Sequence, residues 1–158
     1  MAFSGSLRAQ TADEYRSKNN PLYWKNRKPD AAYWQQDVHY TIKAKIDEEQ
    51  HTISASEQLD YWNNSPDTLH YVYFHLWQNA FVKGPYLREL EKANKMKARL
   101  GKNEAEGLGC VVDGLEVDGQ NVEIELDNTI LKVYLPKPLA PGGKATFTMD
   151  FTTYWDDG

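Results

Sequence analysis

The strongest constraint on the fold is a run of side chains that alternate between apolar and polar over residues 38–61. Every second residue from Val38 to Ile46 is apolar, which is the period of a strand with one buried face. Residues 47–50 read as a turn, and a second alternating run follows. Glu57 falls on the apolar side of that run and breaks its pattern, so we expect it near a sheet edge or beside a partner. The two runs predict an antiparallel hairpin.

Further strands are predicted along most of the remaining chain. Residues 68–77 are apolar or aromatic on both faces, as in a strand that is covered on both sides. Alternation resumes over 111–117, where Asp118-Gly119 is a hairpin signal, and continues over 122–126 and 131–135. Residues 136–143 are rich in proline and glycine and are expected to break the sheet before a last strand over 144–155. The chain is therefore predicted to be mostly β, an antiparallel sandwich or saddle-shaped sheets over residues 34–158.

One helix is expected inside this β pattern, at about residues 85–100. Leu87, Leu90 and Leu100 recur at helical spacing, Pro85 suits a first turn, and Gly101 is a natural stop. We expect this amphipathic helix to pack through the three leucines and to leave its lysines in solvent.

Residues 1–33 are expected to form an irregular extension. Residues 1–10 resemble the tail of a secretory signal peptide, with Ala9 as a plausible cleavage position, although an ordinary disordered terminus would read the same way. The signal-like reading predicts a secreted or periplasmic protein.

Composition excludes several classes of function. A net charge of −5 at pH 7 argues against general nucleic-acid binding, which requires a basic footprint. No apolar run approaches the ~20 residues of a membrane-spanning helix, so no transmembrane segment is predicted. Cys110 is the single cysteine and stands in an apolar stretch, where a buried, inert thiol is expected.

The residues do not reveal an active site. His39, His51, His70 and His75 are scattered, and on a regular strand His70 and His75 would point to opposite faces. The sequence contains no zinc-binding H-E-x-x-H helix, no G-x-S-x-G elbow and no phosphate-binding glycine loop. Asp156 and Asp157 are expected to be solvated charges at the end of the chain. No catalytic, cofactor-binding or metal-ligating residue is therefore predicted.

Three segments, in order, resemble the start of the N-terminal domain of aminopeptidase N-type zinc metallopeptidases (gluzincins). The first has the D-x-x-H-Y strand, the turn and the return strand of that domain, the second its third strand, and the third its L-x-x-P-L-x-x-G turn and following strand. They are residues 37–61, beginning Asp37-Val-His-Tyr-Thr; residues 64–76, beginning Asn64-Ser-Pro-Asp-Thr; and residues 135–151, beginning Leu135-Pro-Lys-Pro-Leu. The helix at 85–100 looks like an insertion, which is typical of a divergent bacterial branch.

The resemblance implies a piece of a larger enzyme without its chemistry. The zinc helix and the G-x-M-E-N loop of the family would follow Gly158, so zinc is implied for the absent catalytic domain and none for this chain. The implied role is a non-catalytic domain that docks on that downstream catalytic domain and shapes its peptide cleft, with Tyr154 and Trp155 as candidate docking aromatics.

An alternative is an exported, stand-alone β-sandwich that binds glycan or protein through exposed aromatic rings. Its candidates are Tyr23, Trp24, Trp34, Trp62, Trp77 and Trp155.

Overall fold

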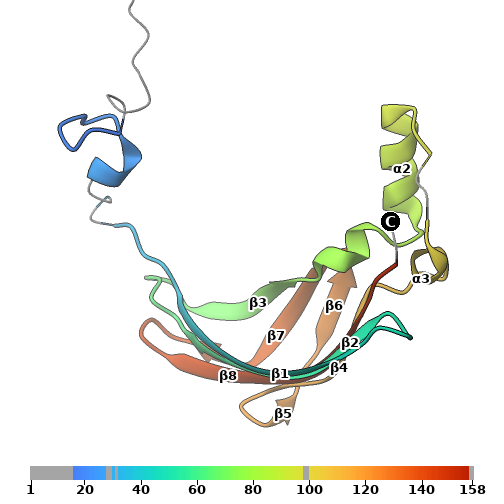
Figure 1. Ribbon diagram of the computed structural model, residues 1–158. Helices are drawn as coiled ribbons and strands as arrows, with labels where there is room; N and C mark the ends of the chain where they lie inside the picture. Colours follow the sequence, from blue (N-terminus) through green and yellow to red (C-terminus); the bar gives the residue numbers. More distant parts are fainter. Residues whose placement is uncertain (1–15, 28–29, 31, 98–99, 157–158) are drawn as a thin grey trace, which may run out of the picture. The chain divides into compact units, whose positions relative to one another are not determined.

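The computed structural model describes residues 16–27, 30, 32–97 and 100–156 (Figure 1). The chain divides into two compact units, Met1–Trp34 and Gln35–Gly158. The first unit contains the 3-10 helix η1 (Trp24–Asn26). The side-chain amide of Asn26 donates to the carbonyls of Ser17 and Asn20, in the preceding turn. The signal-like residues 1–10 lie outside the described residues.

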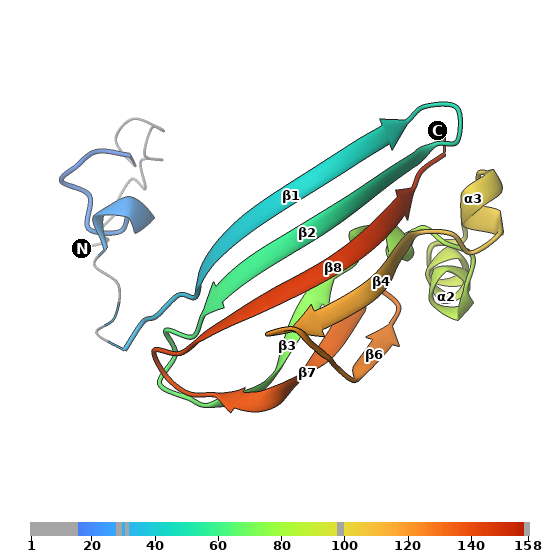
Figure 2. The same cartoon turned by 90° about the horizontal axis from the view of Figure 1, so that it is seen from below.

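Sheet A is the larger of two antiparallel sheets in the second unit, and Figure 2 shows its long strands side by side. Its first two strands are the predicted hairpin, joined by the turn after Asp47. The strand order is β1 (Asp37–Asp47), β2 (Thr52–Trp62), β8 (Lys144–Tyr154), β4 (Cys110–Val117) and β5 (Gln120–Asn121).

Sheet B is shorter and lies against one face of sheet A (Figure 1). Its strand order is β3 (Leu69–His75), β7 (Ile130–Leu139) and β6 (Ile124–Asp127). The predicted mostly β fold with antiparallel sheets is confirmed. The predicted strand over 122–126 begins only at Ile124, as β6. Residues 122–123 connect it to β5, which pairs with β4 in sheet A, whereas β6 pairs with β7 in sheet B.

The core lies between the two sheets. Phe147 on β8 is 0% exposed and meets Tyr61 and Phe74 edge-on, at ring-centroid distances of 6.2 and 5.4 Å. From sheet B, Leu131 and Val133 of β7 close over it. This is the contact through which sheet B covers sheet A.

Two predicted faces are not covered as expected. The apolar side of β1 was expected to be buried, but Val38, Tyr40, Ile42 and Ile46 are all exposed, because β1 is an edge strand beyond the reach of sheet B. On β3 only one face is buried, through Val72. The other side, expected to be covered as well, leaves Tyr71 and Tyr73 exposed.

The break after β7 begins later than predicted. Strand β7 continues through Pro136 and Pro138 to Leu139, although proline cannot donate a ladder hydrogen bond. This is tolerated because β6 pairs only with residues 130–133 of β7. The Asp118-Gly119 signal is confirmed, since both residues have positive φ and connect β4 to β5.

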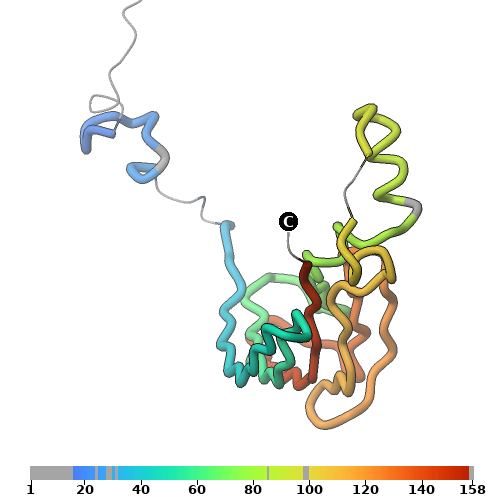
Figure 3. Tube along the Cα trace, turned by 45° about the vertical axis from the view of Figure 1, so that its right-hand side comes forward, coloured from blue at the N-terminus to red at the C-terminus, as the bar shows by residue number. Residues whose placement is uncertain are grey.

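The helix is shorter and less buried than predicted. Helix α2 (Pro85–Asn94) ends at Lys95, which takes the left-handed conformation, and a four-residue helix, α3 (Lys102–Ala105), follows. Leu90 is 49% exposed, so the expected packing through Leu90 is wrong. Figures 1 and 3 show α2 rising away from the sheets. Among the described residues, no helix is both long and apolar enough to span a membrane.

Substitutions at Phe147 and Leu90 should differ in their effect on the free energy of unfolding, because Phe147 is buried and Leu90 is exposed. We expect Phe147→Ala to lower the free energy of unfolding by about 3–5 kcal/mol, because it opens a cavity between the sheets. Leu90→Ala should change it by less than about 0.5 kcal/mol, as for an exposed position. Urea unfolding followed by circular dichroism measures both values. A large loss for Leu90→Ala would show that α2 is docked.

Candidate functional site

The uncovered part of sheet A is the most distinctive surface of the second unit. We call it the open face, and it consists of Val38, Tyr40, Ile42 and Ile46, all on β1, which are 47 to 64% exposed. In the register of the sheet, Tyr40 stands opposite Leu59, which stands opposite the buried Phe147. The open face is therefore the outward continuation of the core.

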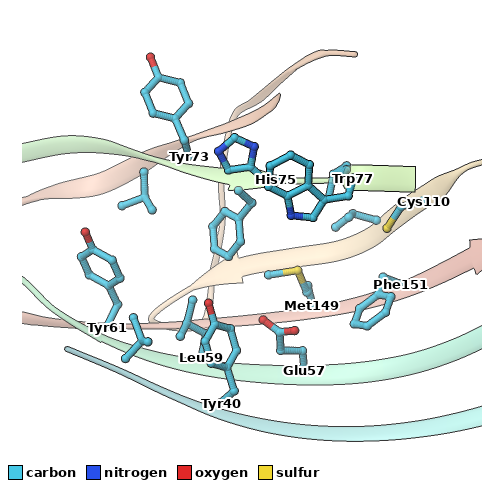
Figure 4. Close-up of a pocket in the computed structure, with 15 residues that line it drawn as sticks. Tyr40, Glu57, Leu59, Tyr61, Tyr73, His75, Trp77, Cys110, Met149 and Phe151 are labelled. Carbon is cyan, nitrogen blue, oxygen red and sulfur yellow. The ribbon is translucent and has the colours of Figure 1, made fainter. Parts of the chain in front are cut away.

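A hollow of about 430 Å³ lies where the open face meets the edge of sheet B. Tyr40, Glu57 and Met149 line it from sheet A, and Val72 and Phe74 line it from the inner side of β3. Tyr73, His75 and Trp77 lie at its rim. Figure 4 shows Tyr40 and Glu57 pointing from neighbouring strands into this space. The hollow thus has apolar and aromatic walls and one carboxylate.

Glu57 is the unusual group in this hollow. It stands opposite Ile42 on β1 and Met149 on β8. No described residue donates a hydrogen bond to its carboxylate or forms an ion pair with it. Burial raises the pKa of Glu57, because a low-dielectric environment disfavours the charged form. The pKa of Tyr40 is raised by burial and, secondarily, by the charge of Glu57.

A stacked pair of rings lies at the rim of the hollow, where β3 ends (Figure 4). His75 ends β3, and Trp77 begins the 3-10 helix η2 (Trp77–Ala80); their rings lie 4.6 Å apart at an angle of 10°. Trp77 is 71% exposed. Asn79 of η2 fixes this segment, since its side chain accepts from the Cys110 N–H at 2.7 Å and donates to the Asn128 carbonyl at 3.0 Å.

The predicted docking aromatics lie beyond the hollow, where β8 ends. Tyr154 and Trp155 are partly exposed, and the Trp155 ring stacks on His51 at 5.8 Å. The Trp155 carbonyl accepts from the Asn103 side chain at 2.9 Å. Neither aromatic lines the hollow.

Asp156 has a structural role that its position in the sequence did not suggest. Its carboxylate accepts from the backbone N–H groups of Asn103 and Glu104, at 3.1 and 2.9 Å, at the start of α3. A side chain at Gly101 would collide with it. Partial burial acts in the opposite direction, yet these N–H groups hold the pKa of Asp156 below its usual range. The expected solvated charge is therefore a helix cap, whereas Asp157 lies outside the described residues.

The other predicted aromatics are dispersed. Trp34, at 45% exposed, belongs to the first unit, and Trp62 lies under the Lys144 ammonium, 5.0 Å from the ring centroid. Sequence reasoning missed a cluster on the outer side of sheet B, where Lys132 lies over the rings of Tyr71 and Tyr134 at 4.7 and 4.4 Å. The apparent two-faced pattern of β3 was its only sequence signal.

The comparisons with known proteins give a low structural similarity and no match in sequence. No protein-family model matches the chain, and no curated protein matches it. A point mutant of an M1 zinc metallopeptidase from Deinococcus radiodurans, solved with a Tyr-Ser-Ala substrate, has a TM-score of 0.49 at 17% identity over 75% of this chain. A two-domain M1 zinc metallopeptidase mutant bound to L-arginine has a TM-score of 0.43 at 17% identity over 78%. The chain spans about a fifth of the length of each.

Metal binding by this chain depends on how its His, Cys, Asp and Glu side chains are grouped. In the described ranges, no three His, Cys, Asp or Glu side chains gather in a geometry that could hold a metal ion. His51 stacks on Trp155 and His75 on Trp77, while His39 lies on the polar side of β1. The His51 and His75 rings are therefore each packed on a tryptophan, at separate places in the fold.

The chain alone is expected neither to hold zinc nor to cleave aminoacyl substrates, because its histidines are dispersed over separate strands and turns. Elemental analysis after dialysis against a chelator, and a fluorogenic aminopeptidase assay with added zinc, measure these two properties. One zinc per chain, or zinc-dependent turnover, would contradict the expectation.

The burial of Glu57 predicts a dependence of stability on pH. Because its pKa is raised in the folded state, folding favours the protonated form. Its favourable contribution is present at acid pH and is lost as the pH rises from the ordinary carboxyl range through the raised pKa. Glu57→Gln should therefore raise Tm near neutral pH and change it little at about pH 4.

Glu48→Gln, in the exposed turn after β1, is the matched control and should leave Tm unchanged at both pH values. Differential scanning fluorimetry at the two pH values is sufficient. A Tm gain for Glu57→Gln that is equal at both would show that the carboxylate charge is not the cause.

Proposed function

We propose that this chain is a non-catalytic β-domain of a larger zinc aminopeptidase-like protein. In this proposal, it docks on the catalytic domain through its uncovered apolar surface and forms one wall of the peptide cleft. The zinc and the reacting groups belong to that other domain. A periplasmic or secreted location, in a bacterium, is part of the same proposal and is supported by the signal-like residues 1–10.

The observation that carries the proposal is the open face. Four large apolar or aromatic side chains in one row on β1 are about half exposed or more. Full burial of such side chains is worth roughly 1.5–3 kcal/mol each, so a surface that covers the row gains a substantial free energy. Contiguous apolar patches of this kind commonly mark interfaces.

The second support is the order of the sequence segments that resemble the aminopeptidase N-terminal domain. The first supplies β1 and β2, the second supplies β3, and the third supplies the end of β7 and most of β8. These strands build both sheets around one core. The resemblance thus follows the elements that create the open face, and it does not depend on α2 or α3.

Reassembly of two fragments tests the docking role. The chain and a separately folded fragment encoded downstream of it are expected to associate at micromolar concentrations, as measured by isothermal titration calorimetry. Ile46→Asp should weaken association at least about tenfold, because it places a charge in the apolar contact. Lys43→Ala, on the opposite face of β1, is the matched control and should have little effect.

Trp155→Ala belongs in the same experiment. If Tyr154 and Trp155 extend the docking surface, this substitution should also weaken association, because buried aromatic rings often contribute about 2 kcal/mol or more at interfaces. Circular dichroism confirms that each variant is folded. If two folded fragments do not associate at high micromolar concentration, the docking role is wrong and a stand-alone binding module is the better account.

A further inference from the structure

The outer edge of β1 is available for another strand. Strand β1 is at one end of sheet A, and no described strand pairs with its outer edge. Its eleven residues pair with β2 in one continuous register without a bulge, and it contains no proline. Natural sheets usually blunt such edges, because unpaired N–H and C=O groups recruit other chains. Of the devices that blunt an edge, β1 has neither a bulge nor a proline and carries two lysines, Lys43 and Lys45. A long, regular edge of this kind is a site for addition of a strand that complements the lysines.

The side chains next to this edge specify the chemistry of an added strand. On the inner side they form the open face, which fits apolar residues. On the other side stand Lys43 and Lys45, which would face acidic residues, since opposite charges across neighbouring strands are favourable. The preferred strand therefore alternates apolar and acidic residues.

Glu57 adds one position with a different requirement. It lies on β2 opposite Ile42 and points into the hollow beside Tyr40 (Figure 4). Strands are about 4.8 Å apart, so a residue opposite Ile42 on an added strand would be roughly 10 Å from Glu57. The flexible four-carbon stem of lysine covers most of that distance while it packs on apolar surface. Its ammonium group would then meet a carboxylate that has no other described partner.

We propose that β1 binds an extended polypeptide segment by strand addition, and that a lysine of this segment enters the hollow and pairs with Glu57. The segment has apolar residues on either side of that lysine and acidic residues on its other face. Val72 and Phe74, on the inner side of β3, line the hollow opposite Glu57 and would pack on the lysine stem. The proposal goes beyond the docking role, because it names the chemistry of a bound strand and does not require it to come from the parent enzyme.

A second copy of this chain fits the edge less well. In the fully overlapping antiparallel register, centred on Ile42, Asp37 of one copy would face Asp47 of the other. Like charges directly opposite are destabilising. A second β1 would also bring Ile42, rather than a cation, to the position nearest Glu57. Charge complementarity therefore favours a different strand.

A synthetic peptide tests the proposal on the whole chain. The probe is an acetylated, amidated nonapeptide, Val-Glu-Val-Glu-Lys-Glu-Val-Glu-Val, and its binding is measured by isothermal titration calorimetry. The matched peptide has norleucine in place of lysine, which keeps the stem and removes the charge. We expect the lysine peptide to bind at least about tenfold more tightly than the norleucine peptide. With the Glu57→Gln protein this preference should disappear, as in a double-mutant cycle.

N-methylated peptides test the backbone ladder. Methylation of alternate amides on one edge should abolish binding, and methylation of the other set should be tolerated, because a strand uses one edge toward its neighbour. Equal binding of both sets, no binding of any peptide at millimolar concentration, or the same lysine preference with Glu57→Gln would overturn the proposal. Concentration-dependent dimers of the free chain that the peptide does not dissociate would show that a second copy occupies the edge. None of these measurements uses the downstream fragment, so the docking role and strand addition can fail separately.

Discussion

The contact between the inner faces of sheets A and B is the interaction on which the second unit depends, and its area is limited by sheet B. Strands β1, β2 and β8 each have eleven residues, whereas β3 has seven and β6 has four. At about 3.4 Å per residue, an eleven-residue strand is roughly 37 Å long and a seven-residue strand roughly 24 Å. Sheet B has only three strands, and of these only β7, with ten residues, approaches the length of the long strands of sheet A. It therefore cannot cover the whole width of the five-stranded sheet. The core around Phe147 is therefore complete, while β1 stays outside it.

This limit explains which parts of the fold could be predicted from the sequence. Alternation with a period of two depends only on the local backbone, so the β1–β2 hairpin and the Asp118-Gly119 turn were correctly predicted. Alternation shows that a face is apolar, but it does not show what covers the face. Val38 and Ile46 read as core residues for this reason, and they are exposed because sheet B does not reach them.

Long-range polar contacts were beyond sequence reasoning for a related reason. Asn63 is 0% exposed, and its amide donates to the carbonyls of Asp67 and Leu139 at 2.8 and 2.9 Å. Leu139 is 76 residues away in the sequence, so a local sequence pattern cannot predict this hydrogen bond. Asn79 and Asp156 act similarly, each joining segments that the sequence separates. A single buried amide without these partners would cost about 1–3 kcal/mol, which is why such residues fix the loops around the sheets.

Glu57 is the one position where the sequence signal and the site coincide. A carboxylate on the apolar side of a strand conflicts with the local pattern, and such conflicts concentrate at functional sites. In the structure, Glu57 lies one strand inside the edge of sheet A, where the core ends and the open face begins. Deeper in the sheet, at the position of Phe147, a carboxylate without a partner would oppose folding. On the outer edge it would be solvated and would select nothing. At its actual position, between the core and the edge, the Glu57 carboxylate is partly desolvated, so its charged form would be stabilised by a cation. It is also open enough for a cation to reach it.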